Sequence, residues 1–323
     1  MLSTENTIYN MDCMEGMKLL PDNSIDLVLT DPPYSSGGLF AGDRKAPTRF
    51  KYTDDDFNGA SRFQDFSGDN MDQRSFTEFM RMVFSVARTK AAPGAIVATF
   101  IDWRNLPAIT DALQAGGWVW RGVVIWDKKS SRPQKGRFRN QCEFVVWGSN
   151  GPLPVDRAVG CLPGLFSFAN VPSQKRHHQT EKPIELLENL LKIVPAGSTV
   201  LDPFMGSGST AVACIKTCRK FVGFELDKDY FQTAQRRICM AAFNAPPRNW
   251  RTRLRRYTMH MVNDKGEAVY YNLVRKNNKD YWLVQGIGST VVYGRDRERR
   301  KSRHFTQEQQ AERYLARHGF RAD

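Results

Sequence analysis

The four residues Asp31-Pro32-Pro33-Tyr34 follow an apolar run, Ser24 to Thr30, and could activate an exocyclic base amine. Such an amine is a poor nucleophile because its lone pair is delocalised into the ring. Hydrogen bonds from its two protons to the Asp31 carboxylate and the Pro32 carbonyl oxygen would draw the nitrogen towards tetrahedral geometry and free the lone pair to attack a methyl group. Tyr34 could stack on a base turned out of its duplex. An ordinary turn ending a strand is the alternative, since Asp-Pro often forms one.

A glycine-rich segment, Asp202 to Thr210, suits a nucleotide-like cofactor. A glycine-rich turn between a strand and a helix lets a ligand approach the backbone and the helix N-terminus. Glu225 ends the next predicted strand, where a carboxylate can accept hydrogen bonds from ribose hydroxyls. The spacing is not Gly-x-Gly-x-x-Gly, which disfavours a nicotinamide cofactor, and a turn without any ligand is the alternative for the loop taken alone. The candidate cofactor residues here are Asp202, Phe204, Gly206, Ser207 and Gly208.

Strands and helices alternate around both motifs, which predicts an α/β fold with a mostly parallel sheet. Two neighbouring strands, joined by a short basic loop, should form an antiparallel hairpin within that sheet. Apolar runs and helical spacing of apolar residues predict strands at 24–30, 95–100, 118–126, 142–147, 198–201 and 221–225, and helices at 76–90, 105–115, 183–194 and 210–217, with a turn at Pro93-Gly94. Residues 35–73 show no periodicity and are expected to form a long loop.

The two motifs together resemble the amino-group DNA methyltransferases, which combine Asp-Pro-Pro-Tyr with Asp-x-Phe-x-Gly-x-Gly. The resemblance covers about residues 8–240 and includes Asn10 to Cys13, Val124 to Lys128 and His178 to Pro183. The catalytic motif precedes the cofactor motif, an order that is similar to the β group of this family. The resemblance implies a Rossmann-like sheet, S-adenosylmethionine as cofactor, double-stranded DNA as substrate and extrusion of the target base.

The resemblance also assigns roles at matching positions. Asp31 to Tyr34 would form the catalytic pocket, and Phe204, Gly206 and Gly208 would shape the cofactor site, with Glu225 on the ribose. Thr180 and Lys182 would lie near the methionine carboxylate, and Asp12 and Cys13 near the adenine moiety. The alternatives are a solvated lysine at a helix start for Lys182 and a turn or cap residue for Asp12.

The choice of base rests on the first residue of the catalytic motif. Asp31 favours N6 of adenine, whereas enzymes that act on N4 of cytosine commonly have Ser there. An RNA or protein amine methyltransferase is a second class, although similar enzymes more often carry Asn and the unpermuted order. A catalytically silent DNA-binding relative is a third, and intact Asp31 and Tyr34 argue against it. A homodimer is compatible with the resemblance, because β-group relatives often pair.

Positive charge is concentrated in two segments of a chain whose net charge is +13. Residues 246–323 hold 18 Lys and Arg against 8 Asp and Glu, and residues 128–176 hold 9 against 2. This distribution favours contact with nucleic acid, and a solvated surface is the alternative. In the hairpin loop, basic side chains could contact phosphate or guanine and Phe138 could stack or wedge between bases. The candidate DNA-binding residues are Arg132, Lys135, Arg137, Phe138 and Arg139.

These observations predict two domains. Residues 1–245 would form the methyltransferase domain, with a catalytic half at 1–149, a target-recognition region at about 128–176 and a cofactor-binding half at 177–245. Residues 250–323 resemble no family that we recognise and should form a small basic, β-rich domain ending in a helix at 307–318. The six scattered cysteines predict free thiols and no metal site. No apolar run is long enough to span a membrane and the polar start is no signal peptide, so the expected location is the cytoplasm.

Overall fold

The computed structural model describes residues 1–33, 71–129, 135–154, 159–172, 181–244, 259–276, 279–294 and 298–322. The chain divides into two compact units, Met1–Ala234 and Gln235–Asp323, each of which is described by itself. Tyr34, Arg132, Thr180 and most of the expected 35–73 loop lie outside the described residues. Within the described residues, no helix is both long and apolar enough to cross a membrane.

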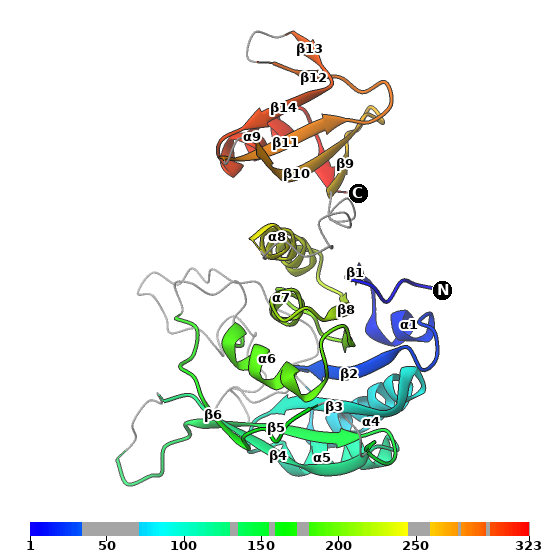
Figure 1. Ribbon diagram of the computed structural model, residues 1–323, viewed down its shortest axis with the longest axis vertical. Helices are drawn as coiled ribbons and strands as arrows, with labels where there is room; N and C mark the ends of the chain where they lie inside the picture. Colours follow the sequence, from blue (N-terminus) through cyan, green and yellow to red (C-terminus); the bar gives the residue numbers. More distant parts are fainter. Residues whose placement is uncertain are drawn as a thin grey trace. The chain divides into compact units, whose positions relative to one another are not determined.

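The first unit is built on an eight-stranded sheet in the order β1-β8-β7-β2-β3-β5-β4-β6 (Figure 1). Among its described pairings, β5 runs antiparallel to both of its neighbours, and all other pairs are parallel. The expected hairpin is therefore β4 and β5. The strands are β1 (Thr7–Asn10), β2 (Ile25–Thr30), β3 (Ala91–Ile101), β4 (Val119–Asp127), β5 (Cys142–Ser149), β6 (Leu165–Ser167), β7 (Thr199–Asp202) and β8 (Lys220–Glu225).

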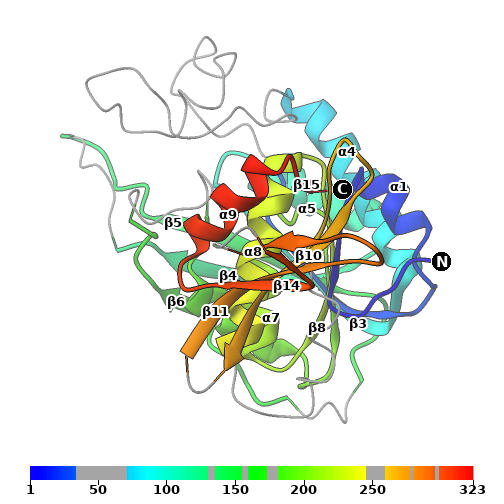
Figure 2. The same cartoon turned by 90° about the horizontal axis from the view of Figure 1, so that it is seen from above.

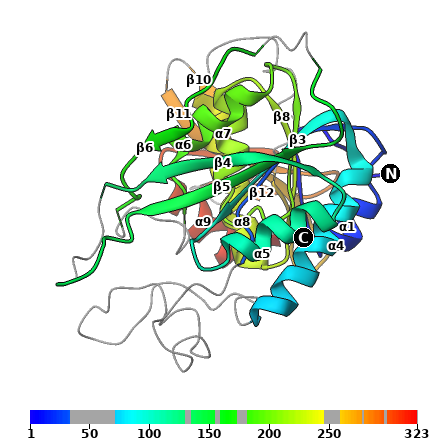
Figure 3. The ribbon, with the colours of Figure 1, turned by 90° about the horizontal axis from the view of Figure 1, so that it is seen from below.

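Helices cover both faces of this sheet, with α1, α4 and α5 together on one face and α6 and α7 on the other (Figure 3). The Asp72 carboxylate caps α4 by accepting hydrogen bonds from the Arg74 and Ser75 amides, and α4 then buries Phe76, Met80 and Phe84 at helical spacing. The helices are α1 (Cys13–Lys18), α4 (Gln73–Lys90), α5 (Leu106–Ala115), α6 (Ile184–Leu190), α7 (Ser209–Lys216) and α8 (Lys228–Asn244), which crosses the boundary between the units.

Two local expectations are wrong in detail. The expected turn at Pro93-Gly94 lies inside β3, which begins at Ala91. The pairing of β3 with β2 shifts register between Ile25 and Leu27, so the expected turn is a bulge in a continuous strand. The bulge is accommodated by Gly94, whose φ of 75° lies in the region that favours glycine. The expected helix 183–194 ends at Leu190 and continues as a 3-10 turn, Leu191–Ile193.

The second unit contains a five-stranded antiparallel sheet in the order β14-β11-β10-β9-β15, with α9 (Glu308–Arg317) against β11 and β14 (Figure 2). It has its own apolar core, in which Trp282 stacks on Tyr271 with ring centroids 5.1 Å apart. The remaining strands are β9 (Met259–Val262), β10 (Ala268–Lys276), β11 (Lys279–Gly286), β12 (Val292–Tyr293), β13 (Arg299–Arg300), β14 (Ser302–Phe305) and β15 (Arg321–Ala322). A β-rich fold with a late helix is thus observed.

Candidate active site

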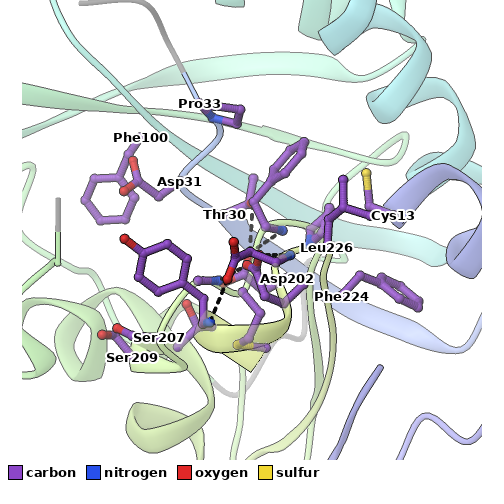
Figure 4. Close-up of a pocket in the computed structure, with 18 of the residues that line it drawn as sticks. Cys13, Thr30, Asp31, Pro33, Phe100, Asp202, Ser207, Ser209, Phe224 and Leu226 are labelled. Atoms are coloured by element: carbon purple, nitrogen blue, oxygen red, sulfur yellow. Dashed lines mark hydrogen bonds between the residues drawn. The ribbon is translucent and has the colours of Figure 1, made fainter. Parts of the chain in front are cut away.

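A cavity of about 620 Å³ lies at the carboxyl ends of β2, β7 and β8 (Figure 4). Ligands of open α/β sheets bind at this edge, because the loops that follow parallel strands converge there. Both motifs reach the cavity even though they are far apart in the sequence. Its lining includes Met11, Asp12, Cys13, Thr30, Asp31, Pro33, Met71, Phe79, Phe100, Glu181, Lys182, Leu187, Asp202 to Ser207, Ser209, Thr210, Phe224 to Lys228 and Tyr230.

The catalytic motif begins where β2 ends. Asp31 and Pro33 line the cavity, and the Asp31 carboxylate lies at its wall (Figure 4). Immediately before it, the buried Thr30 hydroxyl donates a 2.9 Å hydrogen bond to Asp202 Oδ1 on β7. This bond joins Thr30, the last residue of β2, to Asp202, the first residue of the glycine-rich segment. The structure brings the two motifs together around one space.

Lys182 contacts the catalytic motif directly. Its Nζ donates to Asp31 Oδ2 at 2.6 Å, lies 3.5 Å from Glu143 Oε2 and sits 5.2 Å from the centre of the Phe100 ring. Its side chain is 6% exposed, so the solvated-lysine alternative is wrong. Burial disfavours the ammonium, but the charges of Asp31 and Glu143 outweigh it and raise the pKa of Lys182. The lysine therefore remains charged within the wall of the cavity.

The glycine-rich segment turns the chain from β7 into α7. Gly206 and Gly208 have φ of 53° and 86°, the left-handed region that glycine adopts without strain. A Cβ on Gly208 would lie 3.0 Å from Ala234 Cβ, so this glycine also permits close packing of α8. Phe204, Gly206 and Ser207 line the cavity, whereas Gly208 is absent from the lining and shapes the turn from behind.

The buried Asp202 and the half-buried Glu225 hold this loop, and the pKa of each carboxylate is raised. Burial raises the pKa of Asp202 to about 6, although hydrogen bonds from Thr210, Thr30 and the Phe204 amide oppose the rise. Burial likewise raises the pKa of Glu225 to about 7, against hydrogen bonds from the Asp227 and Gly206 amides. These two amides donate at 2.8 and 2.7 Å to opposite oxygens of Glu225. Glu225 thus ties the end of β8 to the glycine loop.

Asp12 and Cys13 line the cavity from the start of α1. The Asp12 carboxylate is the N-cap of α1, because its Oδ1 accepts hydrogen bonds from the Met14 and Glu15 amides at 2.8 and 3.2 Å. The cap alternative for Asp12 is therefore confirmed, alongside its place in the lining. Burial raises the pKa of the Cys13 thiol to about 12, so Cys13 is a neutral, apolar part of the wall.

The hairpin residues do not line the cavity. Lys135, Arg137 and Arg139 are exposed in the segment between β4 and β5, and Phe138 between them is fully exposed. An aromatic side chain that buries no surface in the free protein, among three cations, is available to a partner. Within the described part of the chain, no cluster of three or more His, Cys, Asp or Glu residues could hold a metal ion.

Several residues of the site escape the sequence patterns. Glu143 carries one charge within an apolar strand, and Thr30 reads as an ordinary β-former at a strand end. Phe79 and Phe204, whose ring centroids are 6.0 Å apart, both line the cavity, but Phe79 looks like a helix core residue. Gly223 stands beneath the loop, where a Cβ would lie 2.1 Å from Met205 Cε. Of these residues, only Glu143 has a feature in the sequence that could have indicated it, namely a charged residue within an otherwise apolar strand.

Comparison with known proteins defines the class. A family model described as DNA methylase, covering N6 and N4 amino methyltransferases, matches residues 25–158 and 163–236. The chain belongs to this DNA methylase family, and its resemblance to the β group is confirmed. It is therefore a DNA methyltransferase of the N6/N4 family.

Individual relatives agree with that membership. YubD of Escherichia coli (strain K12) is 28% identical over 229 residues, covering 70% of this chain and 87% of YubD. The type II methyltransferase M.HinfI of Haemophilus influenzae is 28% identical over 259 residues, covering 72% of this chain and 68% of M.HinfI. The crystal structure of the M1.HpyAVI–SAM complex has a TM-score of 0.52 at 24% identity, covering 72% of this chain and 98% of that one. The expected Rossmann-like methyltransferase fold is confirmed.

Proposed function

We propose that this DNA methyltransferase transfers a methyl group from S-adenosylmethionine to N6 of adenine in double-stranded DNA. The observation that carries the proposal is the placement of Asp31 at the end of β2, facing one cavity with the glycine-rich loop after β7. A carboxylate at the head of the catalytic motif favours adenine over cytosine. S-adenosylmethionine is the cofactor, and when bound it supplies a methyl group on a positively charged sulfur.

The residues present suit this cofactor. The Glu225 carboxylate can accept hydrogen bonds from ribose hydroxyls, and Asp12 and Cys13 would flank the adenine ring from α1. Gly206 leaves backbone space for a ligand because it has no side chain, and Phe204 and Ser207 line the same wall. We assign Asp202 to the support of the loop, since its carboxylate faces Thr30 and the Phe204 amide. Gly208 shapes the turn, and Thr180 stays a proposal from the family resemblance.

The catalytic residues prepare the amine. Asp31 and the Pro32 carbonyl oxygen accept hydrogen bonds from the two amine protons, which restores the lone pair to the nitrogen. Pro33 walls the pocket, and Tyr34 would stack on the extruded base. In the attack the nitrogen–methyl bond would form as the methyl–sulfur bond breaks, the neutral thioether would leave, and the nitrogen would give up one of its protons to the Asp31 carboxylate or to water. Holding base and cofactor in a fixed geometry removes much of the entropic barrier.

DNA contacts are proposed for two basic segments. Lys135, Arg137 and Arg139, with Arg132, would bind phosphates or guanine edges, and Phe138 would stack beside the extruded base. The 128–176 segment would read the target within a domain of residues 1–245, whose halves are 1–149 and 177–245. The basic 250–323 domain would add sequence-independent attraction to the phosphates. A homodimer and a location in the cytoplasm complete the proposal.

Methylation of unmodified genomic DNA tests the proposal. The protein is incubated with isotope-labelled S-adenosylmethionine, the DNA is digested to nucleosides, and the products are separated by mass, with Asp31→Ala in parallel. N6-methyladenine that disappears in the variant supports the proposal. N4-methylcytosine in its place would show that the base is wrong and the chemistry right. An active Asp31→Ala variant would contradict the assigned role of Asp31.

A further inference from the structure

Charged side chains of alternating sign extend from the catalytic carboxylate into the wall of the cavity. Asp31 contacts Lys182, Lys182 contacts Glu143, and Glu143 contacts Lys128. These residues come from the end of β2, the chain before α6, β5 and the segment after β4. The DNA methylase motifs contain Asp31 and Lys182, but nothing so far gives Glu143 or Lys128 a function.

Lys182 is fixed more firmly than an ordinary ion-pairing lysine. Its ammonium meets two carboxylates and the face of the Phe100 ring, and its side chain is 6% exposed. A surface ion pair contributes little because water screens its charges and because holding the long lysine side chain in one geometry costs conformational entropy, whereas packing already fixes the side chain of Lys182. The 2.6 Å separation from Asp31 Oδ2 is that of a charge-assisted hydrogen bond.

Glu143 holds the other side of Lys182. Its Oε2 lies 3.5 Å from Lys182 Nζ, and its Oε1 accepts a 3.2 Å hydrogen bond from Lys128 Nζ. Burial favours the neutral acid, but the charges of Lys182 and Lys128 outweigh it and lower the pKa of Glu143. Glu143 is therefore ionised, and the two lysines bind its two oxygens separately. A carboxylate held from both sides is a rigid anchor for Lys182.

We propose that Lys182, anchored by Glu143, is a positioning residue that fixes the Asp31 carboxylate and keeps it ionised to accept a hydrogen bond from the target amine. A protonated Asp31 would direct its own proton at the amine and would accept a hydrogen bond only weakly, so it could not help to localise the lone pair on the nitrogen. A nearby cation favours the ionised form. The inference rests on the proposed role of Asp31. It differs from the methionine-carboxylate role that the family resemblance gave Lys182.

Three variants test the inference: Lys182→Met removes the cation, Lys182→Arg keeps it with another shape, and Glu143→Gln removes the anchor at nearly equal volume. Lys216→Met is the matched control, because Lys216 forms an ion pair with Glu188 and is 48% exposed. The kcat at saturating DNA, the pH profile of kcat, the Kd for S-adenosylmethionine and the thermal midpoint are measured for each protein. Charged groups near the site that can affect the profile are Asp12, Asp31, Asp102, Arg104, Lys128, Glu143, Glu181, Lys182, Asp202, Glu225, Asp227 and Lys228, and saturating cofactor removes the contribution of Glu225 to binding.

If the inference is right, kcat falls about 100-fold in Lys182→Met and about 10-fold in Glu143→Gln, in the range expected for a misplaced reacting group. Lys182→Arg recovers part of the loss. The acid limb of Lys182→Met moves to higher pH by about one unit or more, because Asp31 loses its cation. Cofactor Kd stays within about threefold, which is less than the tenfold that 1.4 kcal/mol would produce. In a protein that already carries Asp31→Asn, the addition of Lys182→Met causes no further fall in kcat.

Other outcomes overturn the inference. A raised cofactor Kd with unchanged kcat would place Lys182 on the methionine carboxylate instead. An unchanged acid limb and equal losses in the Asp31→Asn background would show a purely structural role. If Lys182→Met does not fold, Lys182→Arg and Glu143→Gln decide by the same measurements. Failure of the proposed function is distinct, since it appears as a wild-type protein that methylates neither base.

Discussion

Thr30 and Asp202 end adjacent parallel strands and are joined by a 2.9 Å hydrogen bond from the threonine hydroxyl to Asp202 Oδ1. Both side chains are buried, with 1% and 3% of their surface exposed. The bond connects the strand that carries Asp31 to the strand that carries the glycine loop. It therefore holds the two motifs in a fixed relation to one another at the wall of the cavity.

Replacement of Thr30 by Val should destabilise this junction. The variant keeps the shape of the side chain but removes a donor to a buried carboxylate, which costs about 1.5–3 kcal/mol of the free energy of unfolding. The pKa of Asp202 should also rise further above about 6. Urea unfolding of Thr30→Val and Thr30→Ser measures the difference, since serine retains the hydroxyl. A Thr30→Val variant as stable as the wild type would show that the bond contributes nothing.

Cofactor binding should depend on pH through Glu225. Its pKa is about 7, and only the ionised carboxylate accepts hydrogen bonds from both ribose hydroxyls. The affinity for S-adenosylmethionine should therefore rise with pH, about tenfold between pH 6 and pH 8, with release of a proton on binding. Calorimetry in buffers of different ionisation enthalpy counts that proton. Glu225→Gln should bind weakly and without this dependence, whereas Glu78→Gln on the surface of α4 should behave like the wild type.

The protein without cofactor should show the opposite trend in stability. In the unfolded protein the Glu225 carboxyl loses its proton near pH 4.5, whereas in the folded protein it keeps the proton until about pH 7. Between these values the folded state binds more protons, so the free energy of unfolding falls as pH rises through this window. Asp202 adds the same trend between about 3.8 and 6. Thermal midpoints that rise from pH 5 to pH 7 and are unaffected by Glu225→Gln would contradict the assignment to Glu225.

The hairpin cations should contribute to DNA binding but not to cofactor binding. Each of Lys135→Ala, Arg137→Ala and Arg139→Ala should lower the log–log salt slope of DNA affinity by about 0.9, the change expected for one lost phosphate contact. The Kd for S-adenosylmethionine should not change. Lys192→Ala, at an exposed lysine of the 3-10 turn, is the control.

Phe138 should act on the base rather than on the phosphates. Phe138→Ala should leave the salt slope unchanged and reduce the fluorescence increase of a 2-aminopurine placed at the target, which reports an unstacked base. Its kcat/KM should fall about tenfold, as for the loss of one stacking contact of 1–3 kcal/mol. A steeper or shallower salt slope with unchanged fluorescence would show that Phe138 does not stack on bases.

The second unit should unfold independently of the first. Trp282 is 7% exposed in a core that belongs to this unit, and its replacement by Ala should cost about 3–5 kcal/mol. Calorimetry should show two transitions, of which Trp282→Ala lowers one, while the Kd for S-adenosylmethionine stays the same. A single transition that shifts as a whole would show that both units form one cooperative domain.

Much of the first unit could be predicted because its signals are local. The glycine loop requires positive φ at fixed positions, and Asp-Pro-Pro ends a strand through the missing proline amides. The hairpin, the helix faces and the order of strands and helices also follow from short stretches of sequence. The bulge at Pro93-Gly94 could not be told from a turn, because the residues that resolve it lie on β2 and pair with β3 across the sheet.

The charge network could not be predicted for the same physical reason. Lys182 and Asp31 are 151 residues apart in sequence, and no periodicity connects them. The family resemblance placed Lys182 in the site but gave it a different neighbour. For Asp12 the cap prediction is confirmed, since one carboxylate oxygen caps α1; the residue also lines the cavity, and its contact with the adenine moiety stays a prediction. The sequence shows which charged residues are present, but which of them contact one another depends on the folded sheet.

The position of β7 between β8 and β2 has a consequence for biosynthesis. A ribosome completes β2 to β5 long before β7, so the nascent half-sheet exposes the edge of β2, a strand whose residues 27–30 are all buried in the finished protein. Leu27 and Val28 of β2 cannot form their pairing with Val200 and Leu201 until β7 has been synthesised. Such an apolar edge can pair wrongly with other strands until β7 covers it. The growing chain cannot complete the cavity until Glu225, which lines it, has emerged, so this site forms late in translation.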